Sequence, residues 1–294
     1  MRFTEIGQQL RAFRLESGLR AEEIAARLGV SRAALYRYEK GEVIKLDTIQ
    51  RLAELLKISP LSLLGIGVEY YNRLSGFLER TRQIEETADQ ILQLSGALCY
   101  LTSSEALDAF LAEAHAEILE QVGADRATLK TTIDQVQSLL GARKRAYTMR
   151  RPGIIAMIPA DAITRFVSAG VAGGLPLSER LRSRAREVAV SEMALIATLM
   201  ETEPMGLQFG LLTGGEPNGA FEIIRTRDRA SLSVNPFRVD SHPAVSAGVA
   251  MVTAADEAIV VHQRVAEINW REAVKGTAAA ARVRQLIGAA SPAG

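Results

Sequence analysis

The stretch SRAALYRYEKGE, residues 31–42, sets polar and basic side chains at the spacing of one helix face. Its outward positions hold Arg32, Ala33, Tyr36 and Arg37, since residues three and four apart lie on the same side of a helix. Guanidinium groups donate several hydrogen bonds, and a tyrosine hydroxyl can donate or accept one. Such a face could contact a nucleic acid, or it could be an ordinary solvated helix surface.

A second group of basic side chains occurs late in the sequence. Three arginines alternate in the run IIRTRDRA, and along one strand alternate side chains point the same way. With the basic residues of NPFRVDSHP they could hold a carboxylate or phosphate ligand. The predicted ligand residues are Arg225, Arg227, Arg238, His242 and Trp270, the last lining the wall of the site. Alternatively, the arginines form a solvated sheet face and the tryptophan lies in the core.

Signatures of enzyme chemistry are missing from the sequence. It contains neither a Gly-x-Ser-x-Gly elbow nor a glycine-rich loop ending in Gly-Lys-Ser/Thr. The three histidines stand far apart and the chain has one cysteine, so a zinc site is not expected. We predict no catalytic residue, no metal and no cofactor. Cys99 could be a redox switch or, as more often, a buried structural thiol.

Composition bounds the class of protein. The 294 residues suffice for about two domains. No apolar run approaches the roughly 20 residues that a membrane span needs, and the N-terminus does not resemble a secretion signal. A single cysteine fits a reducing compartment. These features predict a cytoplasmic protein with no membrane contact.

The elements around the basic face must hold it in position. Residues 1–66 are predicted to form a small helical domain that does so. Apolar residues repeat at helical spacing, and Gly29 supplies a tight turn because glycine accepts positive φ. Ser31 is a suitable N-cap for the following helix, and Asp47 for the next. The first 66 residues carry eleven basic and eight acidic side chains, a weak electrostatic indication of a nucleic-acid surface.

This region resembles the lambda-repressor-like (Cro-repressor, or xenobiotic-response-element) helix-turn-helix family. The resemblance rests on EEIA, the LGVS turn, YEKGE and LDTIQRLAELL, and covers about residues 4–64. It implies that the third helix enters the DNA major groove. By position, Arg32, Ala33, Tyr36 and Arg37 would face base edges, and arginine can pair with O6 and N7 of guanine.

The resemblance also implies contacts that hold the DNA backbone. The phosphate contacts would come from Arg20, Ser31, Lys40 and Lys45. The family often has Thr-Gln where this chain has Arg20-Ala21. Arg20 could take over a phosphate contact, but the side chain of Ala21 cannot form a hydrogen bond.

The middle region, residues 67–150, is predicted to be helical. Over residues 67–95 a seam repeats every three or four residues: Tyr70, Leu74, Phe77, Thr81, Ile84, Ala88, Ile91 and Ser95. A period near 3.5 favours a coiled-coil dimerisation helix, and such DNA-binding domains usually read paired half-sites. The alternative is one amphipathic helix packed on its own chain. A basic run at residues 142–151 is either an anion or DNA site or a solvated helix end.

Residues 151–294 show a different pattern, typical of an α+β domain. Short apolar runs at GIIAMIP, MGLQFGLL, AFEIIRTRD, ASLSVNP and AGVAMVTA predict strands, with helices expected between the first two runs and after the last. We expect a mostly antiparallel sheet with helices against it.

The fold class predicted is thus multidomain: an all-α helix-turn-helix domain, a helical dimerisation region and a C-terminal α+β effector-binding domain. The chain is predicted to be a homodimeric transcription regulator, such as a repressor, that binds double-stranded DNA at paired half-sites under control of a small-molecule effector. Two alternatives are an enzyme with a fused autoregulatory DNA-binding domain and an antitoxin-type repressor.

Overall fold

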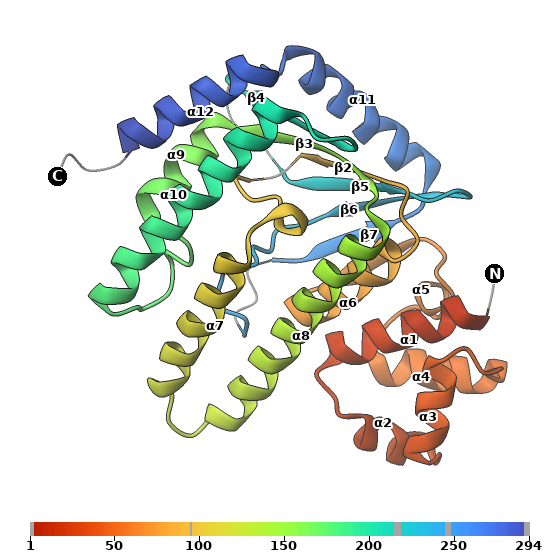
Figure 1. Ribbon diagram of the computed structural model, residues 1–294. Coiled ribbons are helices and arrows are strands. Elements are labelled where there is room, and N and C mark those ends of the chain that lie inside the picture. The colour runs from red at the N-terminus through yellow and green to blue at the C-terminus, as the bar shows by residue number, and fades with distance from the viewer. Residues whose placement is uncertain (1–2, 95, 215–218, 245–247, 291–294) are drawn as a thin grey trace.

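The computed structural model describes residues 3–94, 96–214, 219–244 and 248–290. A group of helices at the N-terminal end packs against one side of a layered α/β body (Figure 1). One apolar cluster extends from the N-terminal helices into that body without a break, and includes Leu10, Phe13, Phe77 and Ile91. The N-terminal helices are therefore docked on the rest of the chain through a shared core.

The N-terminal helices follow the signals in the sequence. They are α1 (Phe3–Ser17), α2 (Ala21–Leu28), α3 (Arg32–Glu39), α4 (Leu46–Leu56) and α5 (Pro60–Leu63). Gly29 ends α2 with φ of 71°, a conformation that a side chain would disfavour. Ser31 caps α3, and its hydroxyl oxygen accepts the Ala34 N–H at 3.1 Å. The expectation that Asp47 caps the next helix is wrong, because α4 begins at Leu46 after Lys45.

Strands of the described chain form one seven-stranded sheet in the order β1-β7-β6-β5-β2-β3-β4. They are β1 (Val68–Tyr71), β2 (Gln90–Leu94), β3 (Gly153–Pro159), β4 (Leu207–Leu212), β5 (Phe221–Arg225), β6 (Ala230–Val234) and β7 (Ala250–Thr253). Pairings on the β1 side, as far as β5 with β2, are antiparallel. Pairings of β2 with β3 and of β3 with β4 are parallel, so the sheet is mixed.

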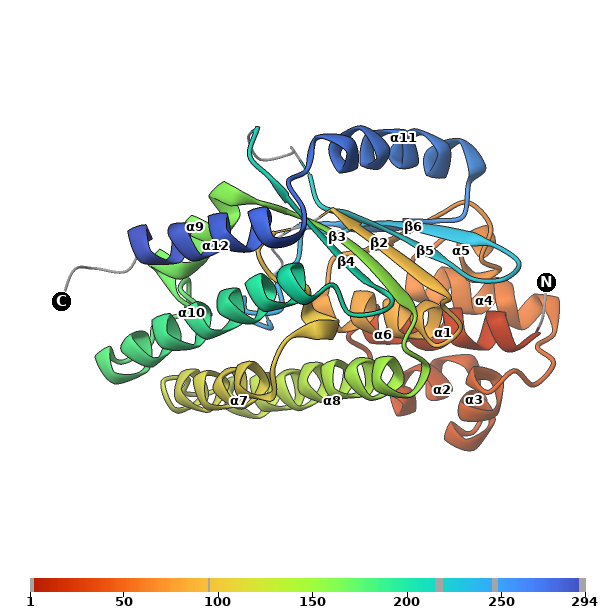
Figure 2. The same cartoon turned by 45° about the horizontal axis from the view of Figure 1, so that its top comes forward.

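Helices cover both faces of the sheet. The remaining ones are α6 (Leu74–Glu85), α7 (Glu105–Glu120), α8 (Arg126–Arg150), α9 (Ala160–Ala169), α10 (Glu179–Thr202), α11 (Asp256–Glu272) and α12 (Gly276–Ala290). Figure 2 shows α11 above the sheet and α6, α7 and α8 below it. The α11 side has a separate apolar cluster that includes Leu92, Phe221, Ile223 and Ile259.

The continuous helix and dimerisation seam expected over residues 67–95 are wrong. That segment forms β1, α6 and β2, and the sheet therefore takes two strands from the region expected to be a helical linker. Every residue of α6 except Arg82 is buried within this chain, which leaves no free face for a coiled coil. The apolar spacing arose from three separate elements that face the same core. Ser95 lies outside the described residues.

No helix among the residues that the structure describes has the length and apolar character needed to cross a membrane.

Candidate functional site

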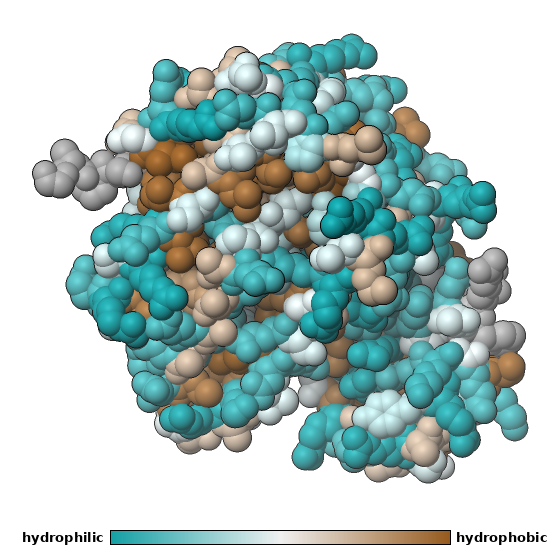
Figure 3. Space-filling model, viewed as in Figure 1, coloured by the Kyte–Doolittle hydropathy of each residue, from teal (hydrophilic) through white to brown (hydrophobic). Residues whose placement is uncertain are grey.

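The predicted base-reading face is carried by α3. Arg32, Ala33 and Arg37 are exposed and Tyr36 is half-buried, while Ala34 and Leu35 are buried beneath them. Figures 1 and 2 place α2 and α3 on the side of α1 that faces away from the sheet. The surface over these helices is mostly hydrophilic (Figure 3). The face is therefore free to meet a large ligand.

The two arginines of this face are each paired with an exposed carboxylate. Arg32 lies 2.7 Å from Glu22, and its guanidinium also stacks on the ring of Tyr36, 5.3 Å from the centroid. Arg37 lies 2.9 Å from Glu42. Exposed ion pairs contribute about 0–1 kcal/mol, so both guanidiniums can exchange their partners for a base or phosphate at little cost.

The predicted phosphate-contacting residues lie around the ends of these helices. Lys40 and Lys45 are exposed, at the C-cap of α3 and the N-cap of α4. Arg20 is the N-cap of α2 and pairs with Glu23 at 2.9 Å. Ser31 is exposed but already uses its hydroxyl oxygen to cap α3. The same atom can still donate its proton to a phosphate oxygen.

A buried polar cluster joins α1 to α6 and β1. The Glu69 carboxylate accepts two hydrogen bonds from Arg80, at 2.7 and 2.9 Å. It also accepts one from the Tyr71 hydroxyl at 2.7 Å and one from the Gln9 amide at 2.6 Å. All four residues are buried. Because a buried carboxylate must be paired to be tolerated, this cluster holds α1 in one position on the sheet domain.

Further contacts along α6 complete what we call the α1–α6 junction, residues 8–16 with residues 69–83. Arg11 lies 3.0 Å from the buried Glu79. The Glu16 carboxylate accepts the backbone N–H groups at residues 72 and 73, at 2.6 and 3.0 Å. A Cβ on Gly76 would lie 2.9 Å from the Cα of Glu16, so the two helices touch where only glycine fits.

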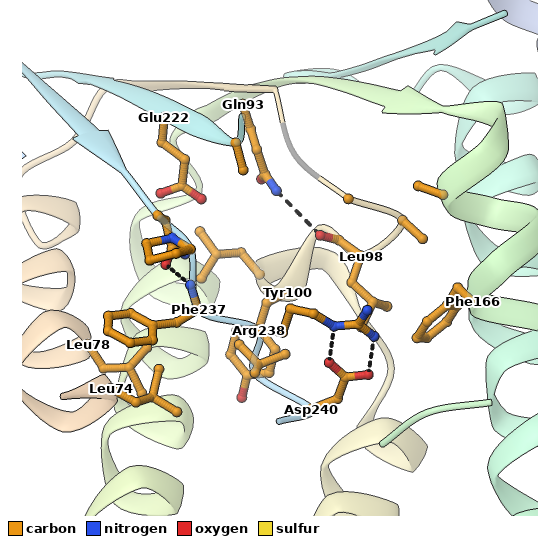
Figure 4. A pocket seen from close by; sticks show the side chains of 18 of the residues that line it. Leu74, Leu78, Gln93, Leu98, Tyr100, Phe166, Glu222, Phe237, Arg238 and Asp240 are labelled. Atoms are coloured by element: carbon orange, nitrogen blue, oxygen red, sulfur yellow. Dashed lines mark hydrogen bonds and ion pairs between the residues drawn. The ribbon is translucent and has the colours of Figure 1, made fainter. Parts of the chain in front are cut away.

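A cavity of about 540 Å³ lies between the sheet, α6, α9 and the loop at residues 235–240. Leu74, Phe77 and Leu78 of α6 form one wall, and Phe166 and Phe237 form others (Figure 4). Its size and apolar walls are typical of small-molecule sites. Sequence reasoning missed this cavity because its walls come from segments far apart in the chain.

Polar groups enter the cavity at defined points. Gln93 and Glu222 are cross-strand neighbours on β2 and β5 and point into it (Figure 4). Arg238 forms two hydrogen bonds to Asp240, at 2.9 and 2.8 Å, on the opposite wall. Desolvation raises the pKa of Glu222 to about 7, against the opposing effect of Arg143. The one sequence feature that could have indicated this cavity is Glu222, a single acidic residue within the apolar strand FEIIR.

Three of the five cations in the basic run at residues 142–151 are bound to other parts of this chain. Arg143 is buried and donates two hydrogen bonds to Glu85 of α6, at 2.8 and 2.7 Å. Lys144 pairs with Asp108 of α7 at 2.5 Å. Arg150 donates to the carbonyl of residue 88 at 2.7 Å. These cations tie α8 to α6, α7 and the loop before β2.

The predicted ligand residues do not form one site. The prediction that the arginines alternate along one strand is wrong. Strand β5 ends at Arg225, so Arg227 lies in the turn before β6. Arg225 contacts Gln263 of α11 at 2.8 Å, on the sheet face opposite the cavity. Of the set, Arg238 lines the cavity.

The other two members of that set lie elsewhere. Trp270 lies on α11, beneath the ammonium group of Lys275 at 4.8 Å. The Nδ1 of His242 accepts the backbone N–H of Ala244 at 3.2 Å, and His242 does not line the cavity.

Cys99 is buried, and burial raises its thiol pKa to about 11, so it is protonated at neutral pH.

Comparisons with known proteins concern mainly the N-terminal end. No curated protein matches the chain. Among solved structures the chain is similar to TrmBL2, an archaeal chromatin protein that shows a novel mode of DNA binding. The two have 11% sequence identity and a TM-score of 0.32, over 78% of this chain and 62% of TrmBL2, less than two thirds of its length. We draw no conclusion about fold or function from a similarity this low.

The family comparison is specific. Residues 5–63 match a family described as a helix-turn-helix domain. The match spans α1 to α5 and includes the exposed face of α3. The N-terminal end of this chain is therefore a helix-turn-helix DNA-binding domain.

Proposed function

We propose that the protein is a homodimeric transcription regulator whose lambda-repressor-like domain reads paired operator half-sites, and whose cavity receives the controlling signal. The helix-turn-helix match and the exposed arginines of α3 support DNA binding. The cavity is assigned to binding rather than to catalysis. Arg32, Ala33, Tyr36 and Arg37 read bases in this proposal, and Lys40 and Lys45 contact phosphates.

The observation that carries the control step is a line of aromatic rings between the two sites. Phe13 of α1 stacks on Tyr71 with centroids 5.4 Å apart. Tyr71 meets Phe77 of α6 at 6.5 Å, and Phe77 meets Phe237 at 5.8 Å. Phe77 and Phe237 line the cavity, whereas Phe13 lies in the helix-turn-helix core. Packed rings cannot move independently, so the cavity wall and α1 are mechanically connected.

Helix α6 provides the same connection through its two faces. Leu74, Phe77 and Leu78 face the cavity, while Gly76 and Glu79 contact α1. A ligand that shifts α6 must therefore shift α1 and the attached α3. Because paired half-sites lie about 34–36 Å apart, a change in the position of each α3 changes DNA affinity. A ligand achieves this only to the extent that it binds one arrangement better than the other.

DNA binding is tested on the full chain with DNA from upstream of its own coding sequence. Fluorescence anisotropy should show preference for this DNA over a scrambled fragment, with affinity that falls steeply as salt rises. Sedimentation should show two chains on one DNA. A chain with equal affinity for both fragments at every salt concentration would contradict the proposal.

Control by the cavity is tested without knowledge of the ligand. Leu98 is half-buried and lines the cavity, so Leu98→Trp should occupy part of it. We expect DNA affinity to change by about 5-fold or more, the usual scale of allosteric coupling. Leu199→Trp is the matched control, at a half-buried leucine of α10 outside the cavity. Equal effects of the two variants, or none, would refute the control step.

A further inference from the structure

One carboxylate in the cavity has no hydrogen-bond partner among the residues that the structure describes. Glu222 is partly accessible from the cavity side, and no described residue donates a hydrogen bond to its carboxylate. Its neighbours across the sheet are Gln93 and Ser233. The Gln93 amide donates to the Leu98 carbonyl at 3.3 Å, and the buried Ser233 hydroxyl has no partner among the described residues.

Two of the three arginines that line the cavity are held by other carboxylates. Arg143, which faces Glu222 from α8, is bound through two hydrogen bonds to Glu85. Arg238 is bound in the same way to Asp240. Both arginines thus spend their paired hydrogen bonds on other carboxylates and not on Glu222. Arg165, the other cation that lines the cavity, lies exposed on α9.

Energetics disfavour the ionised form of Glu222 in the unliganded chain. Desolvation and the charge of Glu85 raise its pKa, and Arg143 only partly opposes them, so the pKa reaches about 7. A cation placed beside a desolvated carboxylate recovers that energy. Native structures rarely leave such a group unpaired without a functional reason.

The rest of the cavity suits the apolar part of such a cation. Leu74, Leu78 and the rings of Phe77, Phe166 and Phe237 line it. A volume of about 540 Å³ accommodates a small organic molecule but is large for a metal ion. Aromatic rings also attract organic cations through their electron-rich faces.

We propose that the cavity binds an organic cation, a molecule with an apolar body whose protonated amine pairs with the Glu222 carboxylate. The amine donates to Glu222, with the Gln93 side chain beside it, and the apolar body lies against Phe77 and Phe237. The inference rests on the proposed function in taking this cavity as the signal site.

Three probes with one apolar body test the head group: 4-phenylbutylamine, 4-phenylbutan-1-ol and 4-phenylbutyrate. Calorimetry on the full chain at pH 8 should show the amine binding about 10-fold or more tightly than the other two, since an ionic hydrogen bond contributes more than a neutral one. In Glu222→Gln that preference should disappear while the alcohol is nearly unaffected. Glu187→Gln, at an exposed position of α10, should behave as wild type.

Several results would overturn the ligand class. One is a preference for the carboxylate that is lost in Arg238→Gln, which would assign an anion site to the opposite wall. Others are amine affinity that survives Glu222→Gln, and an unmodified chain that binds none of the three probes. The comparison of probes on the unmodified chain holds even if Glu222→Gln were to fold poorly.

The same probes in the DNA-binding assay separate this inference from the proposed function. If the amine binds at Glu222 but leaves DNA affinity unchanged, the ligand class stands and control by the cavity fails. If the amine does not bind while Leu98→Trp changes DNA affinity, control stands and the ligand class fails.

Discussion

Arginine–glutamate pairs occur both at α3 and in the α1–α6 junction, in opposite surroundings. On α3, Arg32 and Arg37 meet exposed carboxylates. In the junction, Arg80 and Glu69 are buried and bound to each other, and Tyr71 and Gln9 also donate hydrogen bonds to Glu69. The same two residue types therefore serve different ends. Exposed pairs can release their arginines to a ligand at little cost, whereas buried pairs hold two parts of the chain in fixed relation.

The largest expected effect comes from the buried pair. Glu69→Ala removes the carboxylate that accepts two hydrogen bonds from Arg80 and leaves the buried guanidinium without that partner. We expect a loss of about 3–5 kcal/mol in the free energy of unfolding, measured by chemical denaturation. Glu42→Ala, at the exposed pair with Arg37, should cost at most about 1 kcal/mol. Similar losses in the two variants would break the comparison.

Glu222 extends the comparison because it is a desolvated carboxylate to which no described residue donates a hydrogen bond. Its pKa is raised from 4.5 to about 7, so between these pH values the folded chain keeps a proton that the unfolded chain has released. Stability must then fall as pH rises through this window. Relative to Glu222→Gln, wild type should lose about 1–3 kcal/mol between pH 4.5 and pH 8.

The pH effect is measured as the difference between the two unfolding free energies, so that titrations common to both proteins cancel. Arg143 of α8 and Glu85 of α6 both act on Glu222, and Gln93 and Ser233 flank it in the sheet. If Arg143 balanced the charge in full, the difference would not change with pH.

A smaller effect is expected at the exposed arginines, and in a different measurement. Arg32→Ala or Arg37→Ala should leave stability within about 0.5 kcal/mol, as is usual for surface positions. Each should weaken binding to the cognate operator by about 1–3 kcal/mol and relax base preference at one half-site position. Equal losses on cognate and scrambled DNA would instead make both arginines phosphate contacts.

The smallest effect is expected at Lys40, which is exposed at the end of α3. Lys40→Ala should weaken binding to cognate and scrambled DNA alike, because phosphates are the same in both. The slope of log affinity against log salt should fall by about 1. A change in base preference without a change in slope would contradict this role.

Sequence reasoning succeeded where local signals suffice. The cap at Ser31, the glycine turn at Gly29 and the apolar spacing around Leu35 act within a few residues of each other. They need no knowledge of distant segments. For the same reason the helix-turn-helix elements could be placed before the structure was known.

Prediction from the sequence failed where the burial of a residue depends on segments far away in the chain. The seam over residues 67–95 looked like one helix because Leu74, Phe77 and Ile91 all face inward, yet Ile91 belongs to a strand. The cavity escaped notice because β2 pairs with β5, more than 120 residues later, and that pairing brings Gln93 beside Glu222. Strand order across such separations is not encoded in periodicity.

The close contact at Gly76 decides how a movement of α6 would reach α3 in the proposed control. At this point α1 rests directly on α6, whereas α3 lies on the far side of α1 from the sheet (Figure 1). If α6 moves as the proposed control requires, α1 turns about this contact, and α3, which packs on α1, turns with it. The direction in which the exposed side chains of α3 point would then depend on a displacement within α6.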